Sequence, residues 1–510
     1  MLAKVLSSAV LGVEAYMVEV EVDIAPGLPN VNTVGLPDAS VKESRDRVRA
    51  AIKNCGFDFP ARRITVNLAP ANIKKEGACF DLPIACAILA AMGLIKPDRL
   101  QSHLLLGELA LDGGIRGVTG ALPMAVAAAR NRLAGMVLPT ENAPEAAVVE
   151  GIQVFGVETL PQVVEFLNGV QKISPTSVDL QAVFAQHASY GVDLTDVKGQ
   201  AHAKRALEVA AAGGHNILLI GPPGSGKTML AKRLATILPD LALEEAIEVT
   251  KIHSICGLVP SGTALIATRP FRAPHHTISD AGLIGGGSIP RPGEVSLAHH
   301  GVLFLDELPE FKRSVLEVLR QPLEDGIVTI ARAATSVTYP ARFMLAAAMN
   351  PCPCGYFTDP QQPCTCSPPQ IQRYRSRISG PLLDRIDLHL AVPPLRYREL
   401  TTDSQGESSE QVRMRVKYAR AAQQERFRRT RTFCNAQMGV KQLRRHCSIE
   451  PDGLRLLETA IERLGLSARA HDRILKVART IADLEGHETI RTDHLAEAIQ
   501  YRTMDRRAGW

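Results

Sequence analysis

The stretch Asn216–Thr228, NILLIGPPGSGKT, decides the fold of the central part of this 510-residue chain. Its last eight residues match the pattern G-x-x-x-x-G-K-[ST], in which the backbone N–H groups of a glycine loop surround a phosphate. A short apolar strand precedes the loop, and KTMLAKRLATIL after it is expected to form a helix whose positive end faces the anion. Strand, glycine loop and helix in this order predict a parallel α/β domain that binds a nucleoside triphosphate.

The loop supplies the predicted nucleotide contacts. Lys227 is expected to reach the β- and γ-phosphates, and the Thr228 hydroxyl to hold Mg²⁺. The remaining loop residues predicted to cradle the phosphates are Gly221, Pro222, Pro223, Gly224, Ser225 and Gly226.

Two later apolar segments end in polar residues that suit a hydrolysis site. GVLFLDE (301–307) places Asp306 at the end of a strand, where its carboxylate can bind Mg²⁺ through water. Glu307 beside it can polarise the attacking water. RFMLAAAMN (342–350) is a further buried strand, and Asn350 at its end could position the same water. We therefore expect these three side chains to meet the glycine loop at one edge of the sheet.

Arg385 lies in a short structured segment, SGPLLDRIDLHL. An arginine there could reach the γ-phosphate held by a neighbouring subunit and stabilise the charge of the transition state. The alternative is a surface salt bridge with Asp384 or Asp387.

Four of the ten cysteines cluster in NPCPCGYFTDPQQPCTC (350–366), with the spacing C-x-C-x9-C-x-C. Four thiolates in one loop can complete a tetrahedral zinc shell, and they leave no open position for catalysis. A structural zinc ion is therefore predicted, while reduced free thiols, an iron–sulfur cluster or a redox-active disulfide stay open. The predicted ligands are Cys352, Cys354, Cys364 and Cys366.

The glycine loop, LFLDE, the strand-end asparagine, LLDRID and the SAR of Ser467–Arg469 together resemble an AAA+ ATPase. The run RPFRAPHHTISDAGLIGGGSIPRPGEVSLAHHGVLFLDELPEF is similar to the magnesium-chelatase-like group, and within it to the ComM/YifB family. This resemblance covers nearly the whole chain. It implies a hexameric ring with ATP and Mg²⁺ bound between subunits. It also implies that Arg385 acts on the ATP of a neighbouring subunit and that Arg469 closes a helical domain over ATP.

The expected fold class is α/β, with an AAA+ parallel-sheet core and a C-terminal helical lid after an N-terminal α+β domain. The expected limits are 1–170 for the first domain, 171–194 for a linker, 195–397 for the ATPase core with pore hairpins and the four-cysteine loop, and 398–510 for the basic stretch and helical lid.

The first domain resembles the proteolytic domain of Lon, whose fold is similar to ribosomal protein S5, in KKEGACFDLPIACAIL and LLGELALDGGIRGVTGALPMAVAAA. A Lon-type site needs a serine nucleophile and a lysine base. The serine position falls on Cys79 and the lysine position on Leu122. Because a buried thiol without a base is inert, we expect no peptidase activity.

Two segments of the core resemble pore elements of this group. GIVTIARAATSVTYPARF (326–343) predicts a hairpin, and PFRAPHHTISDAGLIGGGSIPRPG (270–293) predicts an inserted loop or hairpin. The pair His275–His276 invites a metal hypothesis, but neighbouring side chains point apart on a strand, so pore lining or a subunit contact is favoured. The predicted DNA contacts are Arg272, Arg291 and Arg332.

Charge and composition narrow the function only in part. The net charge of +5 neither demands nor excludes a nucleic acid, but residues 411–447 hold eleven Lys or Arg against one acidic residue. That stretch either binds DNA or is a solvated helix face. The leading hypothesis combines this stretch and the predicted hairpin with the resemblance to the ComM/YifB family. That resemblance implies an ATP-driven hexameric motor, a helicase or branch-migration translocase, that carries branched or single-stranded DNA in its channel during natural transformation, with recombination proteins as further partners.

Two alternative functions stay open: a chelatase motor that drives Mg²⁺ into a porphyrin with a partner subunit, and a chaperone-like ATPase acting on a protein. The longest apolar run, Pro83–Ile95, is too short to span a bilayer. The other six cysteines are scattered, as is typical of a reducing compartment. We therefore expect a cytoplasmic protein without a membrane partner.

Overall fold

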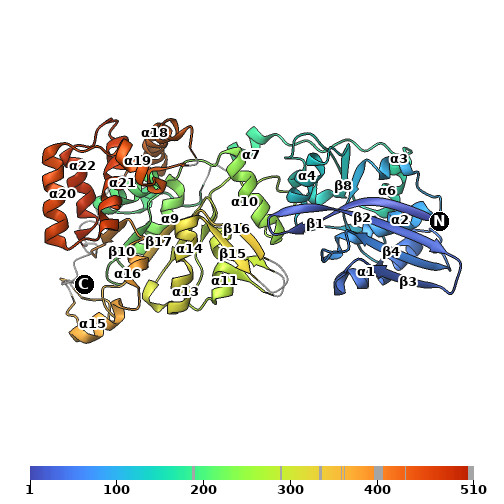
Figure 1. The fold of residues 1–510 in the computed structure, drawn as a ribbon, viewed down its shortest axis with the longest axis horizontal. Coiled ribbons are helices and arrows are strands. Elements are labelled where there is room, and N and C mark those ends of the chain that lie inside the picture. The colour runs from blue at the N-terminus through green and yellow to red at the C-terminus, as the bar shows by residue number, and fades with distance from the viewer. Residues whose placement is uncertain are drawn as a thin grey trace. The chain divides into compact units, whose positions relative to one another are not determined.

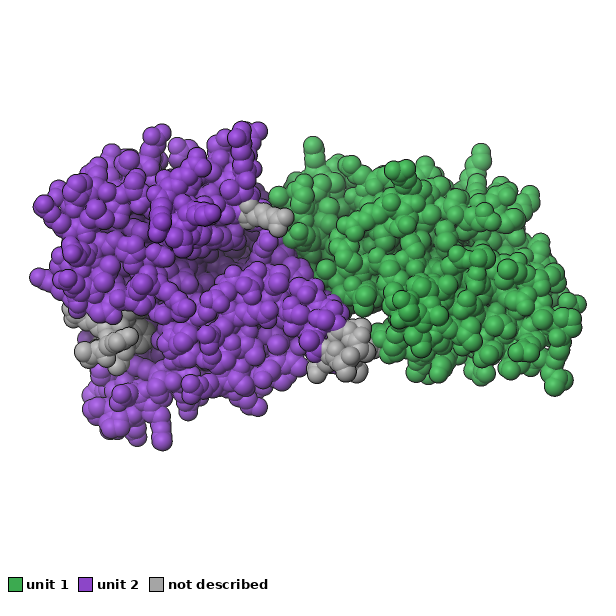
Figure 2. Space-filling view, viewed as in Figure 1, with its two compact units in different colours: residues 1–187, 242–267 green, residues 188–241, 268–510 purple. Residues whose placement is uncertain are grey.

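The computed structural model describes all residues except 187–189, 288–289, 332–335, 358, 361, 395–405, 431 and 504–510. It divides into two compact units, shown in different colours in Figure 2. Unit 1 contains residues 1–187 and 242–267, and unit 2 contains residues 188–241 and 268–510. Each unit has its own buried apolar core.

Unit 1 is built on a mixed sheet with the strand order β3-β4-β2-β1-β5-β8-β9. The alternation in YMVEVEVDI is realised in β2, where valines face the core and the acidic residues between them are more exposed. Strands β1, β2 and β4 pair antiparallel, and the others pair parallel. The sheet strands are β1 (Leu2–Leu11), β2 (Glu14–Ala25), β3 (Asn30–Val34), β4 (Arg63–Ala69), β5 (His103–Leu105), β8 (Gly135–Pro139) and β9 (Gln153–Val157), with a separate ribbon of β6 (Glu108–Leu109) and β7 (Ile115–Arg116).

Several helices of unit 1 pack on this sheet (Figure 1), and one of them, α2, is buried on every side because its sequence DLPIACAILAA is almost wholly apolar. The helices are α1 (Ala39–Asn54), α2 (Asp81–Ala91), α3 (Pro97–Leu100), α4 (Ala121–Arg130), α5 (Ala143–Ala146), α6 (Leu160–Leu167) and α7 (Leu180–Gln186).

One further helix of unit 1, α10 (Leu243–Ile255), comes from the middle of the chain. It packs against α4, and its Ser254 carbonyl accepts the backbone N–H of Gly120 at 3.1 Å. The expected limits placed this segment inside the block 195–397. Periodicity shows which face of a helix is buried but not which core buries it, so the domain limits stay predictions.

Unit 2 is built on a wholly parallel sheet with the strand order β11-β14-β17-β10-β18. Its inner strands are continuous apolar runs because helices cover both faces of such a sheet. The strands are β10 (Ile217–Ile220), β11 (Phe271–Arg272), β14 (Val302–Leu305), β17 (Met344–Met349) and β18 (Leu388–Ala391). The predicted α/β fold class, with a mixed sheet at the N-terminus and a helical region at the C-terminus, is confirmed.

The C-terminal helices lie together beside the sheet of unit 2 (Figure 1). Among them, α18 contacts both α8 and α9, the helix that follows the glycine loop. The helices of unit 2 are α8 (Ala201–Gly213), α9 (Lys227–Ile237), α11 (Asp280–Ile284), α12 (Glu294–Leu297), α13 (Arg313–Val318), α14 (Arg320–Asp325), α15 (Pro368–Arg375), α16 (Gly380–Leu383), α18 (Ser409–Phe427), α19 (Val440–His446), α20 (Pro451–Leu464), α21 (Ala468–Leu484) and α22 (Thr492–Gln500).

Both expected hairpins are present in unit 2. Strand β15 (Ile327–Ala331) pairs antiparallel with β16 (Ser336–Pro340), and β12 (Gly285–Gly286) with β13 (Arg291–Pro292). The two hairpins touch, because Tyr339 donates its hydroxyl to the Pro290 carbonyl at 2.6 Å. In the part of the chain that the structure describes, no helix is long and apolar enough to cross a membrane.

Candidate functional site

The glycine loop joins β10 to α9 and forms an anion cradle. Gly224 and Gly226 have φ values of 75° and 89°, and a Cβ added at either would meet no described atom within 4 Å. This open space lies at the N-terminus of α9, where free N–H groups and the helix dipole attract phosphate. The buried Ser225 hydroxyl has no hydrogen-bond partner among the described residues, so it is free for a ligand. These residues fit a nucleoside triphosphate.

Lys227 closes one side of this cradle and is only 8% exposed. Its Nζ donates to the carbonyls of Gly221 and Pro222, each at 2.8 Å, and to Asn350 Oδ1 at 3.3 Å. Burial lowers the pKa of Lys227, and the nearby carboxylates of Asp306 and Glu307 oppose that shift. The ammonium therefore lies between the glycine loop and the end of β17, next to the anion site.

A hydroxyl and a carboxylate meet beside the same loop. Thr228 Oγ1 donates to Asp306 Oδ2 at 2.7 Å, and the Glu307 backbone N–H donates to Asp306 Oδ1 at 2.9 Å. A half-buried carboxylate beside a P-loop hydroxyl is a ligand pair that suits Mg²⁺ bound to nucleotide phosphates. The residues present fit this ion as well.

Glu307 has a left-handed backbone with φ 52° at the start of the turn Leu308–Glu310. Such strain in a residue other than glycine is concentrated at functional sites. Its Oε2 lies 3.4 Å from Nδ1 of His276. The expectation that His275 and His276 point apart is wrong, because both follow β11 outside any strand and their ring centroids are 4.1 Å apart. The pairing of β11 with β14 brings the segment of this histidine beside the acidic pair, and the His276 ring also packs edge-on against Phe311.

Arg385 is 5% exposed and bonded within unit 2. Its guanidinium donates to the Pro381 carbonyl at 2.6 Å and pairs with Glu324 of α14. The carboxylate that pairs with Arg385 is therefore that of Glu324, and not that of Asp384 or Asp387, the partners expected from the sequence. Arg469 lies exposed in the first turn of α21.

A buried polar junction below the glycine loop was missed by the sequence reasoning. The Asn216 side chain donates to the Arg385 carbonyl and accepts the Leu345 N–H, which links β10 to both neighbouring strands. The Asn216 N–H donates to Asp387, which also pairs with Arg473 of α21. A polar residue just before a strand is common, so no local pattern could have singled out this junction.

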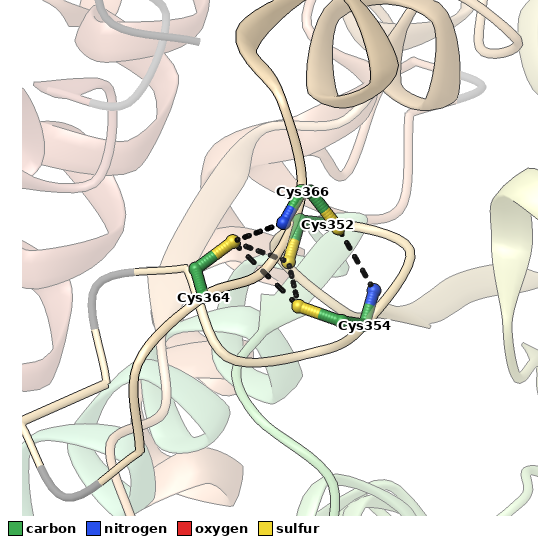
Figure 3. Close-up of side chains that lie close together, drawn as sticks. All are labelled: Cys352, Cys354, Cys364 and Cys366. Carbon is green, nitrogen blue, oxygen red and sulfur yellow. Dashed lines mark hydrogen bonds between the residues drawn. The ribbon is translucent and has the colours of Figure 1, made fainter.

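The four cysteine side chains of the 350–366 loop point toward one another (Figure 3). The Sγ atom of Cys352 lies 3.3 Å from that of Cys354 and 3.7 Å from that of Cys364. Backbone N–H groups also point at the sulfurs, with Cys354 N donating to Cys366 Sγ at 3.4 Å. The backbone N–H of Tyr356, the largest influence, lowers the pKa of Cys354 to about 5 despite partial burial. Such donors favour the thiolate form that binds a metal.

In unit 1, Cys79 and Leu122 are both buried. Burial, with a further contribution from Asp81, raises the pKa of the Cys79 thiol to about 12. The thiolate is therefore disfavoured at neutral pH, which supports the prediction that this domain has no peptidase activity.

The three arginines predicted to contact DNA differ in their exposure and in their partners. Arg291 is exposed on β13, and Arg332 lies outside the described residues. Arg272 donates to both carboxylate oxygens of Glu294, at 2.6 and 2.7 Å.

Neither hypothesis for residues 411–447 describes the whole of that stretch. Arg415 pairs with Glu208 of α8 and Arg426 with Asp483 of α21, so part of its charge joins the C-terminal helices to one another and to the core. Among the described residues of this stretch, the exposed cations are Arg428, Arg429, Lys441, Arg444 and Arg445.

Comparison with known proteins identifies the family. Three family descriptions match in order along the chain: "Subunit ChlI of Mg-chelatase" over residues 20–142, "Magnesium chelatase, subunit ChlI" over 193–400 and "Magnesium chelatase, subunit ChlI C-terminal" over 406–502. The chain is 48% identical over 509 residues to competence protein ComM of Haemophilus influenzae, which covers 99% of this chain and 98% of that protein. The chain belongs to the ComM/YifB family.

Two further proteins are similar to this chain. The protein YifB of Salmonella typhimurium is 48% identical over 511 residues, 99% of this chain and 98% of that protein. The magnesium-chelatase 38 kDa subunit of Rhodobacter capsulatus is 25% identical over 173 residues, 30% of this chain and 49% of that protein. The chain therefore carries an AAA+ ATPase domain of the magnesium-chelatase type, and the resemblance inferred from the motifs is confirmed.

Proposed function

We propose that this protein is an ATP-driven hexameric motor that moves branched DNA, in recombination during natural transformation. The observation that carries the proposal is its similarity, along nearly the whole chain, to a protein named for competence. The magnesium-chelatase subunit covers only 30% of the chain, so a chelatase function is less well supported.

In this proposal the side chains around the glycine loop bind and hydrolyse ATP. Lys227 leaves the loop carbonyls for the phosphates, and Thr228 and Asp306 hold Mg²⁺, which neutralises phosphate charge when bound. Glu307 accepts a proton from the attacking water, and Asn350 orients that water. The strained backbone of Glu307 and its contact with His276 hold the carboxylate at the edge of the site.

Two arginines complete the proposed site. Arg385 acts on the ATP of a neighbouring subunit, and to do so it has to release Glu324. The Glu324 side chain is 55% exposed, so breaking the Arg385–Glu324 ion pair costs less free energy than breaking a fully buried pair. Arg469 is exposed and therefore free to approach the phosphates when the C-terminal helices move.

DNA is proposed to contact the paired hairpins of unit 2. Arg291 is exposed on one hairpin, and strands β15 and β16 of the other hairpin pack beside it. Arg332, the other proposed contact, lies outside the described residues. Arg272 would contribute only if its pair with Glu294 opened. The exposed cations Arg428 and Arg429, which follow α18, and Lys441, Arg444 and Arg445 of α19 give a second surface for phosphates.

The test is ATP hydrolysis with a forked DNA, a four-way junction, an unfolded protein or a porphyrin with its partner subunit as stimulant, together with DNA binding at several salt concentrations. We expect stimulation by branched DNA. Arg291→Ala should lower the slope of log affinity against log salt by about 1, the loss of one phosphate contact. Arg455→Ala is the matched control, since Arg455 is exposed at 81% of its side chain on α20 and far along the chain from either hairpin. No DNA binding at low salt, or stimulation by protein or porphyrin alone, would refute the proposal.

We also propose that the cysteine cluster holds one structural Zn²⁺. Four sulfurs about 2.3 Å from a tetrahedral zinc ion lie about 3.8 Å apart. The recorded distances of 3.3–3.7 Å between sulfurs are close to that value. Metal analysis should find one zinc ion per chain, and none in Cys352→Ser/Cys364→Ser. Free thiols would instead give no metal, and an iron–sulfur cluster would give iron and a visible absorption band.

A further inference from the structure

The cysteine loop presses on the glycine loop at one residue. Gly355 has φ 90°, and a Cβ built on it would lie 2.6 Å from Cδ and 2.8 Å from Cγ of Pro223. These distances are far below van der Waals contact, so the backbone of Gly355 packs directly on the Pro223 ring. Pro223 belongs to the cradle of the proposed nucleotide site, and any shift of Gly355 is therefore transmitted to that cradle.

The position of Gly355 is set by the cysteine cluster. The Gly355 N–H donates to the Cys352 carbonyl at 3.0 Å. The backbone N–H of Cys354, the residue before Gly355, donates to Cys366 Sγ at 3.4 Å. Two residues beyond Gly355, Phe357 donates its N–H to Cys352 Sγ at 3.3 Å. The turn that presents Gly355 is thus hydrogen-bonded to two of the four cysteines, Cys352 and Cys366.

The base of the same loop is anchored a second time. Arg375 of α15 donates Nε to the Pro351 carbonyl at 3.0 Å, and its guanidinium carbon lies 5.1 Å from the centre of the Phe357 ring. Pro351 directly follows Asn350, whose side chain accepts Lys227 Nζ. The loop therefore reaches the nucleotide site at two points, Asn350 against Lys227 and Gly355 against Pro223.

We propose that Gly355 is a positioning residue for the nucleotide loop, through which the metal-organised cysteine loop sets the strength of nucleotide binding. The inference rests on the proposed nucleotide and zinc sites. Glycine is required here for its backbone conformation and for the close approach to Pro223. Gly355 touches neither phosphate nor metal in this scheme; it acts only by holding the Pro223 ring in place.

The experiment compares Mg·ADP binding to the full chain and three variants by calorimetry, with the zinc content of each sample. Gly355→Ala should weaken binding about tenfold, because an added methyl group in a filled space forces the neighbouring loop to move. Gly465→Ala is the matched control: Gly465 also has a positive φ, 62°, but its added Cβ meets no described atom within 4 Å. It should bind within about twofold of wild type. In hydrolysis, KM of Gly355→Ala should rise more than kcat falls.

A second substitution, at Pro223, tests whether the contact between Gly355 and Pro223 causes the loss of affinity. Pro223→Ala removes Cγ and Cδ, the two atoms that the new Cβ would strike, and leaves only the backbone N at 3.9 Å. Gly355→Ala/Pro223→Ala should therefore regain most of the affinity lost in Gly355→Ala. Removing zinc with a chelator should weaken binding in wild type, and adding Zn²⁺ should restore it.

The outcomes separate the proposals. If wild type binds no nucleotide, the proposed function fails and this inference fails with it. If wild type binds and Gly355→Ala binds equally well, or if the double variant stays as weak as the single one, only the inference is overturned. If wild type contains no zinc but the double variant recovers, positioning by Gly355 is supported and the zinc proposal fails.

Discussion

Asp387 is a buried carboxylate that ties the nucleotide-binding sheet to the C-terminal helices. It is 2% exposed, accepts the Asn216 backbone N–H at 3.0 Å and pairs with Arg473 of α21. His215 Nδ1 lies 3.5 Å away, and burial lowers the pKa of that imidazole, although Asp387 opposes the shift. Asp387→Asn keeps the shape of the side chain but removes its charge, which leaves Arg473 without its carboxylate.

The magnitude follows from the burial of the two partners. Neutralising one member of a buried ion pair costs about 3–5 kcal/mol. Because 22% of the Arg473 side chain is exposed to water, we expect the lower end, about 3 kcal/mol. In a unit of this size that corresponds to a fall in Tm of about 5 °C.

The effect should also depend on pH in a defined direction. Burial by itself would raise the pKa of Asp387, but Arg473 and His215 hold it well below its usual range. An unfolded aspartate has a pKa of about 3.9. Since the folded pKa is lower, the carboxylate stabilises the fold above that value and loses its contribution as pH falls through and below it. The difference in unfolding free energy between wild type and Asp387→Asn should therefore shrink below about pH 4.

The assay is thermal and urea unfolding of the full chain at a series of pH values. Asp472→Asn is the control: Asp472 lies on α21, is exposed at 45% of its side chain and is paired with its neighbour His471 rather than with a residue of the sheet. It should change stability by less than about 0.5 kcal/mol. Adding Arg473→Met to Asp387→Asn should cost less than the sum of the two single changes. An Asp387→Asn protein that melts within about 1 °C of wild type would refute the reasoning.

Three further outcomes are expected from other sites. Glu307→Gln should still bind ATP but hydrolyse it at least about 100-fold more slowly, measured as phosphate release at saturating ATP, because the general base is lost; turnover near the wild-type rate would contradict its role. Asp306→Asn should raise the Mg²⁺ concentration needed for half-maximal hydrolysis, since the carboxylate beside Thr228 is replaced by a weaker neutral ligand; an unchanged Mg²⁺ titration would remove it from the site. Casein and peptide hydrolysis should be undetectable in wild type, because burial raises the pKa of the Cys79 thiol to about 12; activity that disappears in Cys79→Ala would show the opposite.

The parallel sheet and its glycine loop could be predicted because their determinants are local. GPPGSGKT lies between a four-residue apolar strand and a helix, and the carboxyl ends of parallel strands meet at one edge of a sheet. Asp306 and Asn350 therefore had to lie near Lys227 once each was placed at a strand end. The CxC pairs likewise predicted that four thiols would meet, since they share one loop.

Charge count was a poorer guide to function, for a physical reason. The number of Lys and Arg residues in 411–447 does not reveal that Arg415 pairs with Glu208 and Arg426 with Asp483. These pairs join segments far apart in sequence, and whether a cation faces solvent or a carboxylate depends on packing.

What the sequence by itself determined is the set of short-range patterns: the phosphate loop, the buried strands with their acidic ends and the four-cysteine loop. Only the tertiary structure decided the contacts that connect them, namely His276 against Glu307, Asp387 against Arg473 and Gly355 against Pro223. Periodicity and motif spacing constrain residues within one element or one loop. Which side chains of distant elements touch is settled by close packing of the whole core, where a single added methyl group has no space.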